Sequence, residues 1–291
     1  MGMMGASLAA SLRKDPGLRI AGVVRSQKSK EFIESHELAT EVYCASGLSD
    51  LPVALDEFDL MVLGMPVNAN GVLLEELGAR SAGTIPLITD MSSTRTYLEK
   101  VAAQFPDLPF IGSHPMCGSE DTGPSAVKEE LFRNRLVILI RSSIRSPEKQ
   151  ENFDKLSQFW KHLGSHVFEL NERDHDLVLA YLSHAPHLLS SLLATVTARR
   201  PEVRNINRQS PIPITGGGLR DMLRIAGSNP EMWRDILQTN RNYIAESLRD
   251  LRQGLDELIQ TVESDDLDWW AGWQNQSRKD RNEICGYNED T

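Results

Sequence analysis

The stretch Ile85-Pro-Leu-Ile-Thr-Asp-Met-Ser-Ser-Thr-Arg95 joins a short apolar run, residues 85–89, to a loop rich in hydroxyl side chains. Four more apolar or β-branched runs lie in the same half of the 291-residue chain and alternate with helical stretches: residues 18–24, 60–64, 110–112 and 136–140. Short strands that alternate with helices are typical of βαβ units. The first half therefore predicts a mostly parallel, doubly wound α/β sheet.

The second half of the chain has the pattern of an all-α domain. A helix that begins at Pro147 carries its apolar residues on one face: Phe153, Leu156, Phe159, Trp160 and Leu163. A continuing apolar stripe predicts one long helix over residues 230–262, and so long a stripe usually packs on other helices or on a partner subunit. We expect two domains, residues 1–145 and 146–291, with the boundary near residues 141–150.

Composition narrows the class of protein. With 40% hydrophobic and 25% charged residues the chain is an ordinary globular protein, and no apolar run approaches the roughly 20 residues that cross a bilayer. The N-terminus lacks the order of a secretory signal, and three scattered cysteines fit a reducing compartment, so we expect a cytoplasmic protein. The net charge of −10 disfavours nucleic acid or an anionic membrane as a partner.

Two glycines near the N-terminus suggest a cofactor site. Gly2 and Gly5 precede a helical run and have the spacing of the last two glycines in G-x-G-x-x-G. In a Rossmann-type domain this motif brings the backbone close to a dinucleotide pyrophosphate. Met65 and Pro66 follow the apolar run at residues 60–64 and are expected beside the cofactor, because it borders the carboxyl ends of the strands. The alternative for the glycines is a purely structural helix start.

The residues after the next strand indicate which dinucleotide binds. An acidic residue about 20 positions after the glycines normally holds the NAD ribose 2′-hydroxyl. Val24 stands there instead and is followed by Arg25, Ser26 and Lys28, whose donors suit a 2′-phosphate. The sequence therefore predicts NADP in preference to NAD, with a solvated basic turn as the alternative.

The first strand of a Rossmann-type domain, and its first glycine, are not found in this sequence. That strand normally lies at the centre of the sheet, and its loss leaves backbone groups on both neighbours that must pair elsewhere. We therefore expect the sequence to be a shortened version of a longer functional chain. A version extended by a strand and a glycine should then bind NADP more tightly.

Candidate catalytic residues follow two of the predicted strands. His114 lies in the loop Ile111-Gly-Ser-His-Pro-Met-Cys-Gly-Ser-Glu120, where a histidine could move a proton next to the cofactor. Ser93 lies in the first quoted loop and could hydrogen-bond His114 or a substrate hydroxyl. The alternatives are a turn-capping histidine and a helix cap made by Asp90, Ser92 or Ser93.

A histidine pair marks the helical half. In Ser183-His-Ala-Pro-His187, His184 and His187 fall on one face of an otherwise apolar helix, where polar groups need partners. A zinc site is disfavoured because no carboxylate or cysteine ligands lie nearby, and we expect no metal.

An arginine-containing segment follows a glycine run at residues 216–218. Arg220, Asp221 and Arg224 lie on the short helix after it, and guanidinium groups so placed suit bidentate capture of carboxylates. Surface ion pairs are the default alternative. Arg224 is favoured for a functional role because its neighbours are apolar.

Five motifs, taken together, resemble those of the prephenate/arogenate dehydrogenase family of tyrosine biosynthesis. They occur in order over residues 2 to about 260: G-x-x-G-A-S-L, D-M-S-S-T-R, G-S-H-P-M-C-G-S-E, S-H-A-P-H and G-G-G-L-R-D-M-L-R-I-A-G-S-N-P-E-M-W. The H-P-M-x-G and G-G-G-x-R-D-x-x-R-I-A blocks are specific to that family. The resemblance implies a nucleotide-binding domain, a helical domain that forms a homodimer, and an active site between them.

The resemblance also implies roles for individual residues. His114 matches the histidine that takes the proton of the ring 4-hydroxyl while C4 gives up hydride and the ring carboxylate leaves as carbon dioxide. Ser93 matches the serine that positions it, and Arg224 the arginine that grips a substrate carboxylate. His187 and Glu120 match residues that line the same pocket. The other expected residues of the substrate site are Ser183, His184, Arg220 and Asp221.

Finer points of function stay open at the level of sequence. His187 and Glu120 resemble prephenate-using rather than arogenate-using members. The tail is too short for a regulatory ACT domain, so tyrosine inhibition would act at the active site. A β-hydroxyacid dehydrogenase would need a lysine in the helical domain, and none occurs between Lys161 and Lys279. The non-enzyme alternative is an NADP-binding sensor.

Overall fold

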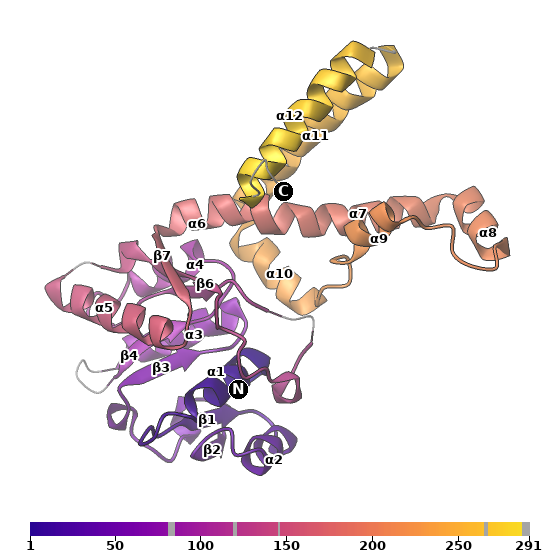
Figure 1. Cartoon of the computed structure of the whole chain (residues 1–291). Helices are drawn as coiled ribbons and strands as arrows, with labels where there is room; N and C mark the ends of the chain where they lie inside the picture. Colours follow the sequence, from indigo (N-terminus) through magenta and orange to yellow (C-terminus); the bar gives the residue numbers. More distant parts are fainter. Residues whose placement is uncertain (81–84, 119–120, 145, 265–266, 287–291) are drawn as a thin grey trace. The chain divides into compact units, whose positions relative to one another are not determined.

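The computed structural model describes residues 1–80, 85–118, 121–144, 146–264 and 267–286. The chain divides into two compact units, Met1–Ile244 and Ala245–Thr291. Figure 1 traces their elements in chain order. The first unit contains the sheet and most of the helices, and it carries the candidate site.

The strands are short. They are β1 (Ala21–Val24), β2 (Glu41–Cys44), β3 (Leu60–Leu63), β4 (Leu87–Asp90), β5 (Ser113–Pro115), β6 (Leu136–Ile140) and β7 (His166–Leu170). The helices among them are α1 (Met3–Leu12), α2 (Gln27–Ser35), α3 (Val67–Gly78), α4 (Thr96–Ala102) and α5 (Pro147–His162). Short 3₁₀ turns lie at Leu48–Asp50, Leu55–Glu57, Pro124–Ala126 and Arg141–Ser143.

The strand pairs are mostly parallel, as predicted. β1 pairs with β2, β3 with β4, and β6 with β7, all in parallel, while β5 pairs with β6 in antiparallel orientation. All five runs predicted from sequence contain or lead directly into a strand. β2 and β7 were not predicted, and the exposed outer face of β7 explains why its sequence lacks a continuous apolar run.

Residues 109–112, just before β5, connect the β3–β4 pair to the sheet formed by β5, β6 and β7. Ile88 of β4 donates its N–H to Pro109 O at 2.8 Å, and Ile111 N–H donates to Ile88 O at 2.9 Å. On the other side, Ile140 N–H of β6 donates to Gly112 O at 3.0 Å. The backbone is therefore hydrogen-bonded continuously from β3 through β4 and this segment to β6 and β7. Within the described residues, β1 and β2 form a separate parallel pair.

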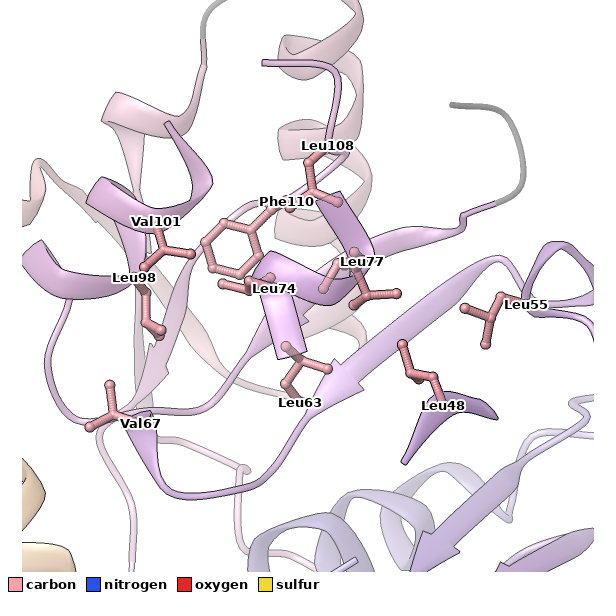
Figure 2. Packing of buried hydrophobic residues seen from close by; sticks show 11 residues of the cluster. Leu48, Leu55, Leu63, Val67, Leu74, Leu77, Leu98, Val101, Leu108 and Phe110 are labelled. Carbon is pink, nitrogen blue, oxygen red and sulfur yellow. The ribbon is translucent and has the colours of Figure 1, made fainter. Parts of the chain in front are cut away.

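One face of the sheet packs on α3 and α4. Leu63 from β3 and Ile88 from β4 meet Leu74 and Leu77 of α3 and Leu98 of α4, all nearly or fully buried. Figure 2 shows the side chains of this cluster, with Phe110 among them. Successive strand residues point to opposite faces, so Met61 packs with this cluster while Leu60 and Val62 pack with the one opposite.

The opposite face packs on α1 and α5. Met3 and Leu8 of α1 lie in one cluster with Val137 and Leu139 of β6 and the fully buried Trp160 of α5. Phe153 and Leu156, also predicted on the apolar face of α5, are in the same cluster. Helices therefore cover both faces, and the predicted doubly wound α/β domain is confirmed.

The segment after residue 145 behaves differently from the expectation. We assigned α5 and the residues after it to the second domain, but α5 packs on the sheet and β7 pairs with β6 along its whole length, from Leu136↔His166 to Ile140↔Leu170. Backbone pairing along five residues ties residues 146–170 to the first domain. The helical part begins only with α6.

The chain after β7 is helical, as predicted. It comprises α6 (Glu172–Leu179), a π-helical turn (Ala180–His184), α7 (Ala185–Arg199), α8 (Pro201–Gln209), α9 (Gly217–Leu223), α10 (Pro230–Thr239), α11 (Arg241–Ser264) and α12 (Leu267–Cys285). α9 is fastened to α7 by Ser190 Oγ, which donates to Met222 O at 2.6 Å. α10 is fastened to α3, where Asn68 Nδ2 donates to Asp235 Oδ1 at 2.8 Å.

The single long helix predicted over residues 230–262 is wrong, because the helix breaks at Asn240. Asn240 has φ −120° and ψ 26°, outside the helical region, and closes α10 by donating its N–H to Ile236 O. Its side-chain Nδ2 donates to Asp176 O of α6 at 2.8 Å. This buried side-chain bond to another helix competes with helix continuation, a contest that the apolar stripe cannot reveal.

The second unit contains α11 from Ala245 onward, together with the whole of α12. In α12 the Trp269 and Trp273 rings stack with centroids 5.8 Å apart, and Trp270 lies 5.3 Å from Trp273. Trp270 and Trp273 remain 43% and 41% exposed. These rings therefore pack mainly on one another within this unit.

Candidate active site

A fully buried ion pair lies at the carboxyl end of β4. The two carboxylate oxygens of Asp90 accept hydrogen bonds from Nη1 and Nη2 of Arg95, each at 2.6 Å, and neither side chain is exposed. The other guanidinium hydrogens go to the carbonyl oxygens of Ser92, Thr94 and Ser113. A guanidinium has five N–H donors, and all of them are used here. The pair therefore fixes the loop after β4 without leaving an unpaired charge.

The charge on Arg95 is stable despite its burial. Burial disfavours the charged form, but the carboxylates of Asp90, Glu99 and Asp176 outweigh that effect and raise the pKa of Arg95. This compensation matters because removing one partner of a buried pair leaves the other charge uncompensated.

Asp176 of α6 caps α4 from a distant part of the chain. Its Oδ1 accepts the N–H of Arg95 and its Oδ2 the N–H of Thr96, both at 2.8 Å. α4 has no cap from its own side chains, so the helix-cap role considered for the loop residues before it is wrong. Ser92 Oγ instead accepts a hydrogen bond from Asn70 Nδ2 at 2.9 Å.

His114 lies at the end of a hydrogen-bonded chain that starts at this carboxylate. Asp176 Oδ1 is 2.9 Å from His175 Nδ1, and His175 Nε2 is 2.9 Å from His114 Nδ1. His175 and Asp176 are fully buried and His114 is 8% exposed. Burial, then the nearby His175, Arg95 and His184, hold the pKa of His114 well below its usual range. His114 is therefore a neutral imidazole at pH 7 and can accept a proton.

His184 lies beside this group. Its Nδ1 accepts a hydrogen bond from Asn240 Nδ2 at 3.1 Å, and its ring meets the Trp233 ring edge to face at 6.0 Å. Burial lowers the pKa of His184 to about 4, against the opposing effect of Asp176. The hydrogen bond from Asn240 thus links the break between α10 and α11 to His184. The sequence did not predict this contact.

His187 lies one turn further along. The ring is half-buried, its Nδ1 donates to Ser183 O at 2.8 Å, and it packs 5.2 Å from the Trp233 ring. Ser183 and His184 belong to a π-helical turn directly before Pro186, which has no N–H to offer a regular helix. Such turns are frequent at functional sites.

Ser93 lies in the loop after β4 and is half-buried. Its hydroxyl makes no hydrogen bond within the described part of the chain, to His114 or to any other residue. The bond to His114 that we considered is therefore not formed here, and the hydroxyl is available to a ligand.

The charged residues on and next to α9 are exposed, unlike the buried Asp90 and Arg95 at the end of β4. Arg220, Asp221 and Arg224 are all exposed. Arg220 Nε donates to Thr215 Oγ1 at 3.2 Å. Arg224, at the C-terminal cap of α9, forms no ion pair in the residues that the structure describes, so the surface-pair alternative does not account for it.

The expected cofactor residues lie at strand ends and helix starts. Gly2 is the N-terminal cap of α1, and a side chain added there would meet nothing within 4 Å, so a ligand could approach the backbone. Gly5 lies in the first turn of α1. Arg25 and Lys28 are exposed and form no ion pair among the described residues, whereas Ser26 caps α2 by accepting the N–H of Ser29 at 3.2 Å. Open backbone and free cations fit a dinucleotide phosphate.

Three more residues were expected at the site: Met65, Pro66 and Glu120. Met65 and Pro66 follow β3, and Pro66 is the N-terminal cap of α3. Glu120 lies outside the described residues. Among those residues no group of three histidine, cysteine or carboxylate side chains could hold a metal ion.

Two family models match consecutive parts of the chain. The nucleotide-binding domain of prephenate dehydrogenase matches residues 9–169, and the dimerization domain of prephenate dehydrogenase matches residues 171–275. The chain belongs to the prephenate dehydrogenase family. It is therefore an NAD(P)-dependent oxidoreductase, and the junction between the two models falls where β7 ends and α6 begins.

Individual members of the prephenate dehydrogenase family are similar over most of their length. The prephenate dehydrogenase of Bacillus subtilis (strain 168) is 31% identical over 274 residues, which are 92% of this chain and 70% of that protein. The crystal structure of Synechocystis arogenate dehydrogenase covers 97% of both chains, with 27% identity and a TM-score of 0.79. Prephenate dehydrogenase from A. aeolicus, solved with hydroxyphenyl propionate and NAD+, shares the fold at 23% identity and a TM-score of 0.82, over 97% of this chain and 95% of that one.

His175 and Asp176 were missed by the sequence analysis. They lie in the charged run Glu-Arg-Asp-His-Asp, a pattern typical of a solvent-exposed helix start. A usable signal was their spacing: each lies four residues before a buried apolar residue, Leu179 and Ala180. Residues four apart share a helix face, so the buried stripe extends back through this pair.

Proposed function

We propose that this chain catalyses the NADP-dependent oxidative decarboxylation of prephenate to 4-hydroxyphenylpyruvate. Its membership of the prephenate dehydrogenase family supports the reaction class. The observation that carries the residue assignment is His114, a buried and neutral histidine at the carboxyl side of the sheet. A neutral imidazole is the form that can act as a base.

The chain's own residues supply binding and proton transfer. When bound, the nicotinamide ring supplies the acceptor for the hydride that leaves C4 of the substrate. His114 takes the proton of the 4-hydroxyl, the bond from the ring to its carboxylate breaks, and carbon dioxide leaves while the ring becomes aromatic. His114 then returns its proton to the phenolate oxygen, so the histidine ends as it began. Ser93, with its free hydroxyl, orients the 4-hydroxyl toward His114.

Arg224 is proposed to bind a substrate carboxylate. Its guanidinium is exposed and has no competing carboxylate among the described residues. Because prephenate is a dianion and the protein carries a net charge of −10, such a free cation is needed to attract it. Arg220 and Asp221 lie on the same short helix and are assigned to the same site.

The cofactor preference is proposed to be NADP. The place normally held by a carboxylate is Val24, and the free cations Arg25 and Lys28 follow it. They can pair with a 2′-phosphate, which NAD lacks. Ser26 is assigned to the same phosphate through its backbone, since its hydroxyl already caps α2.

Prephenate is proposed as the substrate in preference to arogenate. The two differ in the side chain, which bears a keto group in prephenate and an ammonium group in arogenate. His187 donates through Nδ1 to Ser183 O, so its Nε2 is the ring atom left for a ligand. The proposal also depends on Glu120, by the resemblance of both residues to prephenate-using members.

The chain is proposed to act as a homodimer formed through its helical part. Leu182, Leu192 and Val196 are 60%, 53% and 49% exposed along one continuous helical stretch. That stretch, Glu172–Arg199, is the one described segment long and apolar enough to cross a membrane by composition, with 28% of its apolar window buried. A partner subunit explains this apolar surface, because the same stretch carries the buried His175, Asp176 and His184.

A two-by-two assay tests the proposal. Purified protein is mixed with prephenate or arogenate, each with NADP or NAD, and reduced cofactor is followed by its absorbance. The highest kcat/KM is expected for prephenate with NADP. Preference for arogenate would reassign the substrate, and cofactor binding without turnover of either substrate would favour a sensor.

A further inference from the structure

Three buried side chains form one line of hydrogen bonds that ends at His114. Asp176 and His175 come from α6, and His114 comes from β5. The two bonds, Asp176 Oδ1 to His175 Nδ1 and His175 Nε2 to His114 Nδ1, are both 2.9 Å long. With exposures of 0%, 0% and 8%, water cannot replace these partners.

The carboxylate at one end decides where the hydrogens lie. Asp176 already accepts the backbone N–H groups of Arg95 and Thr96 at the start of α4. Burial raises the pKa of Asp176, but the hydrogen bond and charge interaction with His175 and the hydrogen bonds from Thr96 lower it overall, so Asp176 is ionised. An ionised carboxylate can only accept hydrogen bonds. His175 must therefore carry its hydrogen on Nδ1.

The second bond follows from the first. A neutral imidazole has one N–H and one lone pair. Since the hydrogen of His175 is on Nδ1, its Nε2 is an acceptor, and His114 must donate to it from Nδ1. The lone pair of neutral His114 is then on Nε2, the nitrogen outside this chain.

We propose that Asp176 and His175 are positioning residues that hold His114 in the one tautomer whose Nε2 can take a proton from a bound substrate. The inference rests on the proposed function only in identifying that proton as the one on the 4-hydroxyl of the substrate. Neither residue touches the substrate, and neither gains or loses a proton in the cycle. After protonation His114 has hydrogens on both nitrogens and keeps its bond to His175.

Because His114 is buried and neutral, its tautomer has to be controlled. Burial, and after it the neighbouring His175 of α6, Arg95 of the loop after β4 and His184 of the π-helical turn, lower the pKa of His114. Asp90, Glu99 and Asp176 are the acidic groups around Arg95, and Asp90 and Asp176 are bonded to donors already named. His114 is therefore neutral, and a neutral imidazole can place its single hydrogen on either nitrogen. Only the Nδ1–H form leaves Nε2 free to act as a base.

The first test observes the tautomer directly and needs neither substrate nor cofactor. The full chain is labelled with ¹⁵N in its histidine rings, and the His114 resonances are assigned by their loss in His114→Gln. The expected result at pH 7.5 is a protonated Nδ1 and an unprotonated Nε2. A His114 ring protonated on Nε2 would overturn the inference.

The second test compares two substitutions of His175. In His175→Gln the side-chain oxygen can accept from His114 Nδ1, whereas His175→Leu offers no acceptor. His175→Leu should lower kcat by at least about tenfold, within the roughly 10²–10⁴-fold that general-base catalysis contributes. The KM for NADP should stay within about twofold, and His175→Gln should recover part of kcat. Equal losses in both variants would mean that His175 only fills space, and would overturn the inference.

A control variant at an exposed histidine should leave His114 unchanged, and two outcomes distinguish failure of the inference from failure of the proposed function. His166→Gln replaces an exposed histidine of β7 and should change neither kcat nor the His114 resonances. Turnover of prephenate by a His114 with the opposite tautomer would refute the inference and leave the proposed function standing. The expected tautomer in a protein that turns over no cyclohexadienyl substrate would refute the function alone.

Discussion

Arg95 and Arg224 have opposite surroundings. Arg95 is fully buried, and each of its guanidinium hydrogens has an acceptor. Arg224 is exposed and has no ion-pair partner within the described residues. The buried group cannot bind a ligand without breaking the loop that it holds, whereas the exposed one can. Burial with every donor used therefore indicates a structural role, whereas exposure with no ion pair leaves the guanidinium available to a ligand.

The same contrast applies to the two regions that contain them. The β4 loop, β5 and α6 form a buried network that sets the geometry around His114. α9 presents its charges on the surface, fastened to α7 by a bond between Ser190 and a backbone carbonyl. Substitutions in the first region should therefore act on stability and kcat, and those in the second on KM.

The largest effect on stability is expected from Arg95→Met. The change leaves the carboxylate of Asp90 buried without its partner, which typically costs about 3–5 kcal/mol of unfolding free energy. Urea denaturation measures this loss. Arg224→Met is the matched control and should stay within about 0.5 kcal/mol of the parent, because its group is exposed. Similar losses of unfolding free energy in both variants would show that the buried and the exposed arginine do not differ in their contribution to stability.

Acid should destabilise the buried region. The pKa of His184 falls from 6.5 to about 4 on folding, and those of His114 and His175 are also lowered. A group whose pKa is lower in the folded state contributes stability above its unfolded pKa and loses it as pH falls through the folded value. The free energy of unfolding should therefore decrease between about pH 6.5 and pH 4, by about 3 kcal/mol from His184 alone. A flat profile over this range in chemical denaturation would contradict the burial of neutral histidines.

Arg224→Ala should mainly raise KM for the substrate. Losing one charge-assisted contact typically costs about 1.5–3 kcal/mol, which is roughly a 10- to 100-fold rise in KM. The unfolding free energy should hardly change. Steady-state kinetics with prephenate measures the effect, and an unchanged KM would end the assignment of this arginine to the carboxylate.

The smallest effect is expected from Arg25→Asp. The new carboxylate repels a 2′-phosphate and can accept from a ribose 2′-hydroxyl, so the ratio of kcat/KM for NADP to that for NAD should fall several-fold. Arg133→Asp is the control, because that exposed arginine is paired with Glu130. If the ratio is the same in both variants, the 2′-phosphate is recognised elsewhere.

The sequence was sufficient where the determinants are local. Apolar runs and their spacing predicted the parallel strands, whereas His114, expected in a loop after residues 110–112, is buried within strand β5. The same local patterns predicted Ser93 in a loop and Arg224 on a short helix, and the structure places Arg224 at the C-terminal cap of that helix. Among the described residues, the structure leaves both without a side-chain partner.

What escaped prediction depends on contacts between distant residues. Arg95 bonds to Ser113 O, and Asp176 caps a helix that begins 80 residues earlier in the chain. The break at Asn240 likewise follows from a side-chain bond to α6. The local patterns in these three cases are a polar loop, a charged helix start and an apolar stripe. Each pattern is compatible with more than one local structure. Only the packing of other elements selects the observed one.

The substitution His114→Asn is the sharpest test of His114 as the base of the reaction. Asparagine keeps a polar side chain of similar reach but cannot accept the proton. The variant is compared with the parent at saturating prephenate and NADP, and cofactor affinity is measured separately. We expect a fall in kcat of at least about 10²-fold with little change in cofactor affinity. A kcat close to that of the parent would contradict it.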